Sequence, residues 1–253
     1  MQGIPDRSRL MLRLGLLLAA SFPTACATSL PTHPWSGPES ALEVLRHRSA
    51  EVETLACDCV IQLGHSDGDT IVLDGVLYSS APDHLRMAGW KFSERVFDLL
   101  VSGGRSWIHL SSRVEAHAGS SSGLDAIDAD EFASMWRYAN GNIDMDRILS
   151  IEDGGGAEFE VIVSGEAEGV SLVYRIARAT LTVREITIEQ QGMASYRLLL
   201  GGYEVISDIV WPTRLSGSGD HGSFKLRMSE VELNSALPAS AFKPSAKMRM
   251  QTE

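Results

Sequence analysis

The chain has 253 residues, of which 44% are hydrophobic and 22% charged, and this composition excludes a disordered, collagen-like or coiled-coil protein. Its 22 lysines and arginines stand against 33 aspartates and glutamates, for a net charge of −11. Phosphate backbones and anionic membrane surfaces both require a basic face, and the sequence contains no run of more than two adjacent basic residues. We therefore expect neither nucleic-acid binding nor general adsorption to anionic membranes.

Residues 1–25 predict a bacterial signal peptide. Three arginines open the segment, and the apolar run over residues 14–20 that follows them is too short to cross a bilayer. The stretch Phe22–Cys26 resembles a lipobox, in which the cysteine becomes the acylated first residue, although leucine usually stands at the position of Pro23. We predict lipidation of Cys26, which would anchor the protein to a membrane. The alternative is ordinary cleavage after Ala27.

The mature chain begins with an expected tether and a helix. Residues 26–37 contain two prolines and no hydrophobic periodicity, as is typical of an irregular tether. Helical spacing of apolar residues then runs from Pro38 to Leu55, with acidic residues in the first turn, where the helix dipole favours them. A second helical pattern covers Asp128–Tyr138 and ends before Gly141.

Elsewhere the apolar residues recur with a period of two, which predicts β-strands. Sequential strands are expected at residues 55–63, 71–78, 85–92, 96–101, 106–110, 158–164, 171–177, 183–190, 195–201, 206–215 and 223–232. Sequential strands with two helical insertions predict an antiparallel sheet in an α+β protein.

The sequence offers no convincing catalytic or metal site. Gly119–Gly123 matches the Gly-x-Ser-x-Gly motif of serine hydrolases, but it lies in a small polar loop without the strand and helix that the motif requires. His109 and His117 lack the spacing of metal ligands. Cys57 and Cys59 would share one face of a strand, too far apart for an easy disulfide and without two further ligands, so buried thiols are expected. We expect no catalytic residue, metal or cofactor.

The order of these elements resembles a known family. The matching segments follow one another over roughly residues 40–245; they are Gly75–Met87, Phe97–Leu110, Ile206–Pro212, Val231–Asn234 and Ala241–Phe242. With the signal peptide and the first helix, they are similar to the outer-membrane lipoprotein carrier and receptor proteins, the LolA/LolB-like family. The match depends on spaced hydrophobic residues, glycines and prolines, and is more specific for fold than for activity.

The resemblance implies a half-open antiparallel β-barrel over residues 38–247, with helices covering its mouth and an apolar cavity for acyl chains. It implies a non-catalytic lipoprotein of the bacterial envelope, anchored in the outer membrane and facing the periplasm, whose partners are acyl chains or lipoproteins. The chain departs from the carrier at Ala81, which precedes Pro82. The carrier has an arginine before the corresponding proline, so the role of that arginine cannot be carried over to this chain. A non-transferring sensor or scaffold with the same fold is the alternative.

Nine residues are candidates for the cavity lining. They share apolar character and expected inward positions; they are Leu73, Leu77, Leu85, Met87, Leu100, Trp107, Met135, Trp136 and Leu199. The alternative is that they form an ordinary packed core.

The expected hairpin Gly89–Arg95 carries two aromatic residues where a turn would usually be polar. Trp90 and Phe92, flanked by Lys91 and Arg95, suit insertion into a membrane interface or contact with a client's acyl chains. In the receptor branch of the family a hydrophobic residue projects from this hairpin. The alternative is that both rings fold back over the barrel, since residues two apart on a strand share one face.

Overall fold

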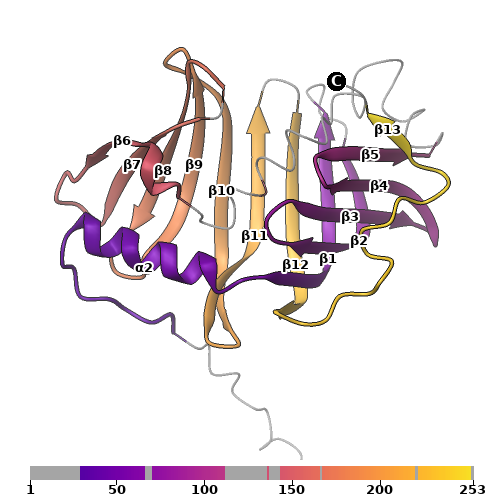
Figure 1. Cartoon of the computed structure of the whole chain (residues 1–253), viewed down its shortest axis with the longest axis horizontal. Helices are drawn as coiled ribbons and strands as arrows, with labels where there is room; N and C mark the ends of the chain where they lie inside the picture. Colours follow the sequence, from indigo (N-terminus) through magenta and orange to yellow (C-terminus); the bar gives the residue numbers. More distant parts are fainter. Residues whose placement is uncertain are drawn as a thin grey trace, which may run out of the picture.

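The structure, a computed structural model, describes residues 29–65, 70–111, 136, 143–165, 167–219 and 222–251. These ranges contain helix α2 (Pro38–Ala50), the short 3₁₀ helix η1 (Met145–Arg147) and thirteen strands (Figure 1). The strands are β1 (Thr54–His65), β2 (Thr70–Ser80), β3 (His84–Lys91), β4 (Glu94–Ser102), β5 (Arg105–Leu110), β6 (Ile148–Glu152), β7 (Glu158–Ser164), β8 (Val170–Ala177), β9 (Thr182–Gln190), β10 (Met193–Ile206), β11 (Ile209–Gly219), β12 (Gly222–Leu233) and β13 (Arg249–Gln251). No helix in the described ranges has the length and apolar character needed to span a bilayer.

All thirteen strands belong to one antiparallel sheet in the order β13-β5-β4-β3-β2-β1-β12-β11-β10-β9-β8-β7-β6. The chain builds β1–β5 outward from the centre, then returns from the far edge through β6–β12 to pair β12 with β1. The two edge strands do not pair with each other, so the sheet is not closed. In Figure 1, β3–β5 run roughly horizontally and β9–β12 roughly vertically, because the sheet is strongly twisted and coiled. The prediction of an antiparallel α+β protein is confirmed.

Strand alternation gives the sheet two unlike faces. The packed face carries the rows of directly opposed residues that form the core, among them Cys57–Leu77–Met87–Leu99 and Ile61–Leu226–Leu215–Leu200. Each of these side chains is at most 5% exposed, and burial of a leucine contributes roughly 1.5–3 kcal/mol. We call the opposite side the outer face. It is largely exposed on the central strands, where Lys225 and Arg227 alternate with the buried Leu226.

Helix α2 lies across one end of strands β6–β10 (Figure 1) and adds Ala41, Leu42 and Leu45 to the core. The helix is shorter than its hydrophobic pattern predicted, ending at Ala50 and not at Leu55, because Leu55 already pairs within β1. Asn234 fixes the connection: its side chain accepts a hydrogen bond from Glu53 N at 2.8 Å and donates one to Glu51 O at 2.7 Å.

The second expected helix, Asp128–Tyr138, falls outside the described residues except for Trp136, which is helical. Helices covering the mouth of the sheet therefore remain a prediction.

The expected tether is docked to the sheet over its last residues. His33 N donates a hydrogen bond to Ala179 O at 2.8 Å. The Trp35 ring lies 5.1 Å from that of Phe159 and 4.7 Å from the guanidinium of Arg178. Attachment to the sheet thus begins at His33, five residues before α2.

Candidate functional site

Four of the nine predicted cavity residues lie together on the packed face. Leu73, Leu77, Leu85 and Met87 occupy adjacent positions on β2 and β3, and each is 0–2% exposed. Trp136 lies over them and is itself buried, and its Nε1 donates a hydrogen bond to Ser79 Oγ at 3.0 Å. These five side chains belong to one packed cluster. In this conformation they fill the space that an acyl chain would need.

Three of the predicted residues lie on the outer face, so their expected inward position is wrong. Leu100 pairs with Arg86 and Trp107, whereas Met87 pairs with Leu99. Directly opposed residues share a face, and neighbours along a strand alternate, so Leu100 and Trp107 lie opposite the packed cluster. Leu199, between the buried Leu198 and Leu200, is 43% exposed. Met135, like Cys26 and the loop Gly119–Gly123, lies outside the described residues.

The outer face of β3–β5 is buried by the end of the chain. Arg86 Nη1 donates to the backbone oxygens of Ser240, Ala241 and Lys243 at 3.1–3.2 Å, and the Phe242 ring lies 5.2 Å from that of His84. Leu100 is fully buried for this reason. Leu100 therefore packs in a second layer, between the outer face of β3–β5 and residues 240–243, which is separate from the core on the packed face.

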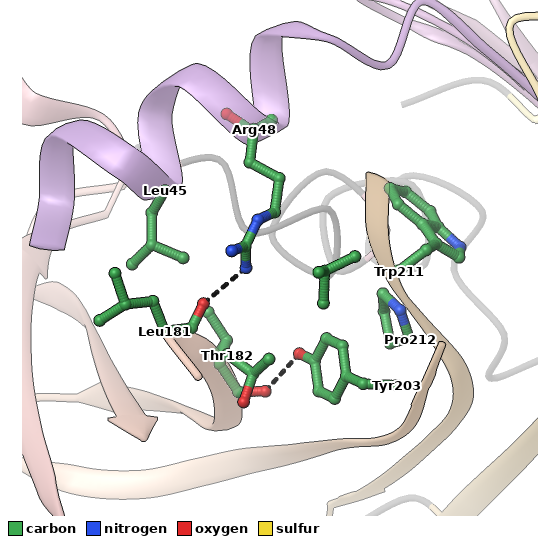
Figure 2. Close-up of a pocket in the computed structure, with 10 residues that line it drawn as sticks. Leu45, Arg48, Leu181, Thr182, Tyr203, Trp211 and Pro212 are labelled. Atoms are coloured by element: carbon green, nitrogen blue, oxygen red, sulfur yellow. Dashed lines mark hydrogen bonds between the residues drawn. The ribbon is translucent and has the colours of Figure 1, made fainter. Parts of the chain in front are cut away.

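A small pocket lies where α2 meets the sheet (Figure 2). Arg48 Nη1 donates to Leu181 O at 2.7 Å, and the Tyr203 hydroxyl donates to Val183 O at 2.5 Å. Burial lowers the pKa of Arg48 and raises the pKa of Tyr203. The pocket volume is about 30 Å³, which holds about one water molecule, whereas ligand pockets measure roughly 300–1,000 Å³. This pocket does not accept an acyl chain.

The hairpin between β3 and β4 projects one aromatic ring into solvent. Phe92 is 88% exposed, and φ is 51° at Phe92 and 66° at Ser93, the two residues between the paired Lys91 and Glu94. Positive φ at both central residues defines a type I′ turn, which favours Asn-Gly and strains a bulky aromatic residue. Such strain often accompanies functional sites.

Trp90 behaves differently from Phe92. It is half-buried within β3, and the guanidinium of Arg95 lies 5.2 Å from its ring. The two rings differ in exposure because Trp90 lies within β3, whereas Phe92 lies in the turn that follows it. The sequence identified the hairpin, but only the backbone shows which ring is presented.

Cys57 and Cys59 are free, buried thiols on the packed face, as expected. Burial raises the pKa of Cys59 to about 12 and also raises that of Cys57. Because the thiolate is the nucleophile and the metal ligand, neither residue is reactive in the folded chain.

No family model and no curated protein matches the sequence. Solved structures do match. An outer-membrane lipoprotein-sorting protein domain from Vibrio parahaemolyticus is 13% identical and superposes with a TM-score of 0.54, covering 81% of this chain and 97% of that one. A LolA superfamily protein from Nitrosomonas europaea is 14% identical, with a TM-score of 0.53 over 80% and 97% of the two chains.

A DUF1329 family protein from Desulfovibrio piger gives a similar result, with 13% identity, a TM-score of 0.55 and coverage of 83% and 98%. At these identities the likeness concerns the fold. It confirms the LolA-like fold predicted from the sequence.

Proposed function

We propose that this protein is a lipoprotein of the bacterial envelope that binds acyl chains of lipids or of other lipoproteins and serves lipoprotein localisation to the outer membrane. The observation that carries the proposal is Phe92, an 88% exposed ring at a strained turn of a LolA-like sheet. A soluble domain gains no stability from such a ring, whereas a membrane interface or an acyl chain would bury it.

The acyl-chain site of this proposal is the packed face of β2 and β3. Leu73, Leu77, Leu85 and Met87 form its floor and Trp136 its cover. Since these side chains are in contact, an acyl chain would enter only if Trp136 moved and broke its hydrogen bond to Ser79. Saturable binding of a hydrophobic fluorescent probe, displaced by palmitate, is the expected result.

The hairpin is tested by Phe92→Ser, with Leu149→Ser as the matched control. Leu149 is also a large exposed apolar residue, 65% exposed on edge strand β6. We expect Phe92→Ser to reduce binding to vesicles or to an acylated client, and Leu149→Ser to leave it unchanged, with no change in thermal stability for either. Equal effects of the two changes would contradict the proposed role of the hairpin.

A non-transferring sensor or scaffold is the second candidate. The observation that favours it is the complete burial of the four floor residues, which leaves them without room for a ligand. Absence of competable probe binding, together with stable capture of an envelope protein, would support this candidate over the first.

The proposed anchor is an acylated Cys26, and the proposed location is the periplasmic side of the outer membrane. Mass spectrometry of the mature N-terminus checks the anchor; an unmodified chain starting after Ala27 would exclude it. We further propose that the protein is not an enzyme. Labelling with a fluorophosphonate would contradict this.

A further inference from the structure

The outer face of the central strands carries a cluster of cations that the linear sequence conceals. Arg214 on β11 pairs directly with Arg227 on β12, and Lys225 lies two residues before Arg227 on the same face. All three side chains are exposed. We call these residues the cationic cluster. It lies near the middle of the sheet, where β11 and β12 run side by side (Figure 1).

The cationic cluster makes no ion pair in the described part of the chain; the nearby Arg197, by contrast, binds Glu185 at 2.8 Å. The nearest carboxylates along the cluster's two rows of opposed residues are Asp74, opposite Val60, and Glu185, opposite Leu199. Cations placed directly opposite each other on neighbouring strands destabilise a sheet. An anion from outside the chain would lower the repulsion between the two opposed arginines.

Exposed apolar side chains accompany the cations on the same face. Val60 pairs with Arg227 and is 42% exposed. Leu199 lies in the same row of opposed residues as Lys225, through Ser216, and is 43% exposed. Val72, 46% exposed, completes this row through Gln62. Basic and apolar side chains side by side match the headgroup region of a bilayer, which offers phosphates and acyl carbons at one depth.

We propose that the outer face of β10–β12, centred on the cationic cluster, docks onto the surface of an anionic phospholipid bilayer. The cluster attracts the headgroup phosphates while Val60, Val72 and Leu199 contact the interface. A bilayer fits better than an acidic protein because the face is part of an open sheet without a described pocket or groove around the cluster.

The hairpin of the proposed function adjoins this face. Lys91 Nζ donates to Val72 O at 3.2 Å and lies 5.8 Å from the Phe92 ring. The docking inference rests on the envelope location proposed above but not on the acyl-chain site. If Cys26 is acylated, it lies seven residues before docked His33, a distance of at most about 25 Å along an extended chain. The sheet would then remain close to the bilayer.

The test measures how close the outer face comes to lipid. Ser218, exposed on the outer face of β11, is changed to cysteine and labelled with a fluorophore. Cys57 and Cys59 are buried and do not react, so the label is confined to this position. The mature protein is reconstituted with vesicles of phosphatidylcholine alone or mixed with phosphatidylglycerol, each containing a headgroup-attached quencher.

We expect strong quenching on phosphatidylglycerol vesicles, lost in 0.5 M salt and in the double variant Arg214→Gln, Arg227→Gln. The control, Arg105→Gln with Arg249→Gln, removes two exposed cations from β5 and β13 and should quench like the parent. Palmitate competition should be unchanged in both, which separates this inference from the acyl-chain proposal.

Equal quenching on both kinds of vesicle would overturn the inference. So would a cluster variant that quenches as well as the parent. Quenching that is absent on all vesicles would overturn it as well.

Discussion

Arg86 and Asp98 form a buried ion pair with two hydrogen bonds between β3 and β4, from Nε to Oδ1 at 2.9 Å and from Nη2 to Oδ2 at 2.7 Å. Asp98 has no exposed surface and also accepts from Arg95 at 2.9 Å. The remaining nitrogen of Arg86 binds three backbone oxygens of residues 240–243. The ion pair therefore orients Arg86 so that it binds residues 240–243 to the outer face of the sheet.

We expect Asp98→Ala to lower the free energy of unfolding by about 3–5 kcal/mol, because Arg86 would remain buried without its partner. Chemical denaturation measures the loss. The exposed pair Asp144–Arg147 is the control: Asp144→Ala should cost at most about 1 kcal/mol. Similar losses for the two variants would show that the buried pair has no special role.

The strained turn predicts opposite effects on stability and function. Replacing Phe92-Ser93 by Asn-Gly supplies the residues that a type I′ turn favours, so we expect thermal stability to rise, by about 1 kcal/mol in free energy. Binding to vesicles should fall because the exposed ring is lost. A variant that is more stable and binds as well as the parent would show that Phe92 has no role at the membrane.

The sequence predicted most of the strands, but it did not predict which face of the sheet each side chain lies on. Alternation placed Leu77 and Met87 correctly, because each lies in a strand with one buried face. It failed at Leu100 because β4 is buried on both faces, and residues 240–243 cover its outer face. A strand that is buried on both faces has apolar residues at consecutive positions, so the sequence does not show which of them point inward. Strands β6 and β13 were missed because they are edge strands of five and three residues.

The cationic cluster was hidden for a related reason. Arg214 and Arg227 are thirteen positions apart in the sequence, and each has uncharged neighbours, so neither forms a basic run. They become neighbours only through the register of β11 and β12. Strand register decides surface charge patterns, and it was not predictable from the sequence alone.

The two packing layers predict different behaviour for two similar truncations. Met87→Ala, on the packed face, and Leu100→Ala, beneath the end of the chain, should each cost about 2–5 kcal/mol of stability. Only Met87→Ala should change the affinity of a hydrophobic probe that palmitate displaces. Leu100→Ala should instead increase hydrogen exchange at residues 240–243. If Leu100→Ala altered probe binding as much as Met87→Ala, the packed face would not be the acyl-chain site.

Alkaline pH should destabilise the fold through its buried thiols. In the unfolded chain a cysteine ionises near pH 9, whereas burial raises the pKa of Cys59 to about 12 and also raises that of Cys57. Above pH 9 the unfolded chain releases protons that the folded chain retains, so the stability present below pH 9 is lost as the pH rises. The loss approaches roughly 1.4 kcal/mol per thiol and pH unit. Denaturation midpoints at pH 8 and pH 10.5 measure it.

The variant Cys57→Ala, Cys59→Ala isolates the thiols from other alkaline groups such as Tyr203, whose pKa is also raised by burial. It should be less stable than the parent at pH 8, because two buried side chains are shortened. Between pH 8 and pH 10.5, however, the variant should lose less stability than the parent. A thiol reagent at pH 8 should modify the parent only after unfolding. Rapid modification of the folded protein, or an equal alkaline loss in the variant, would mean that these cysteines are not buried as the structure places them.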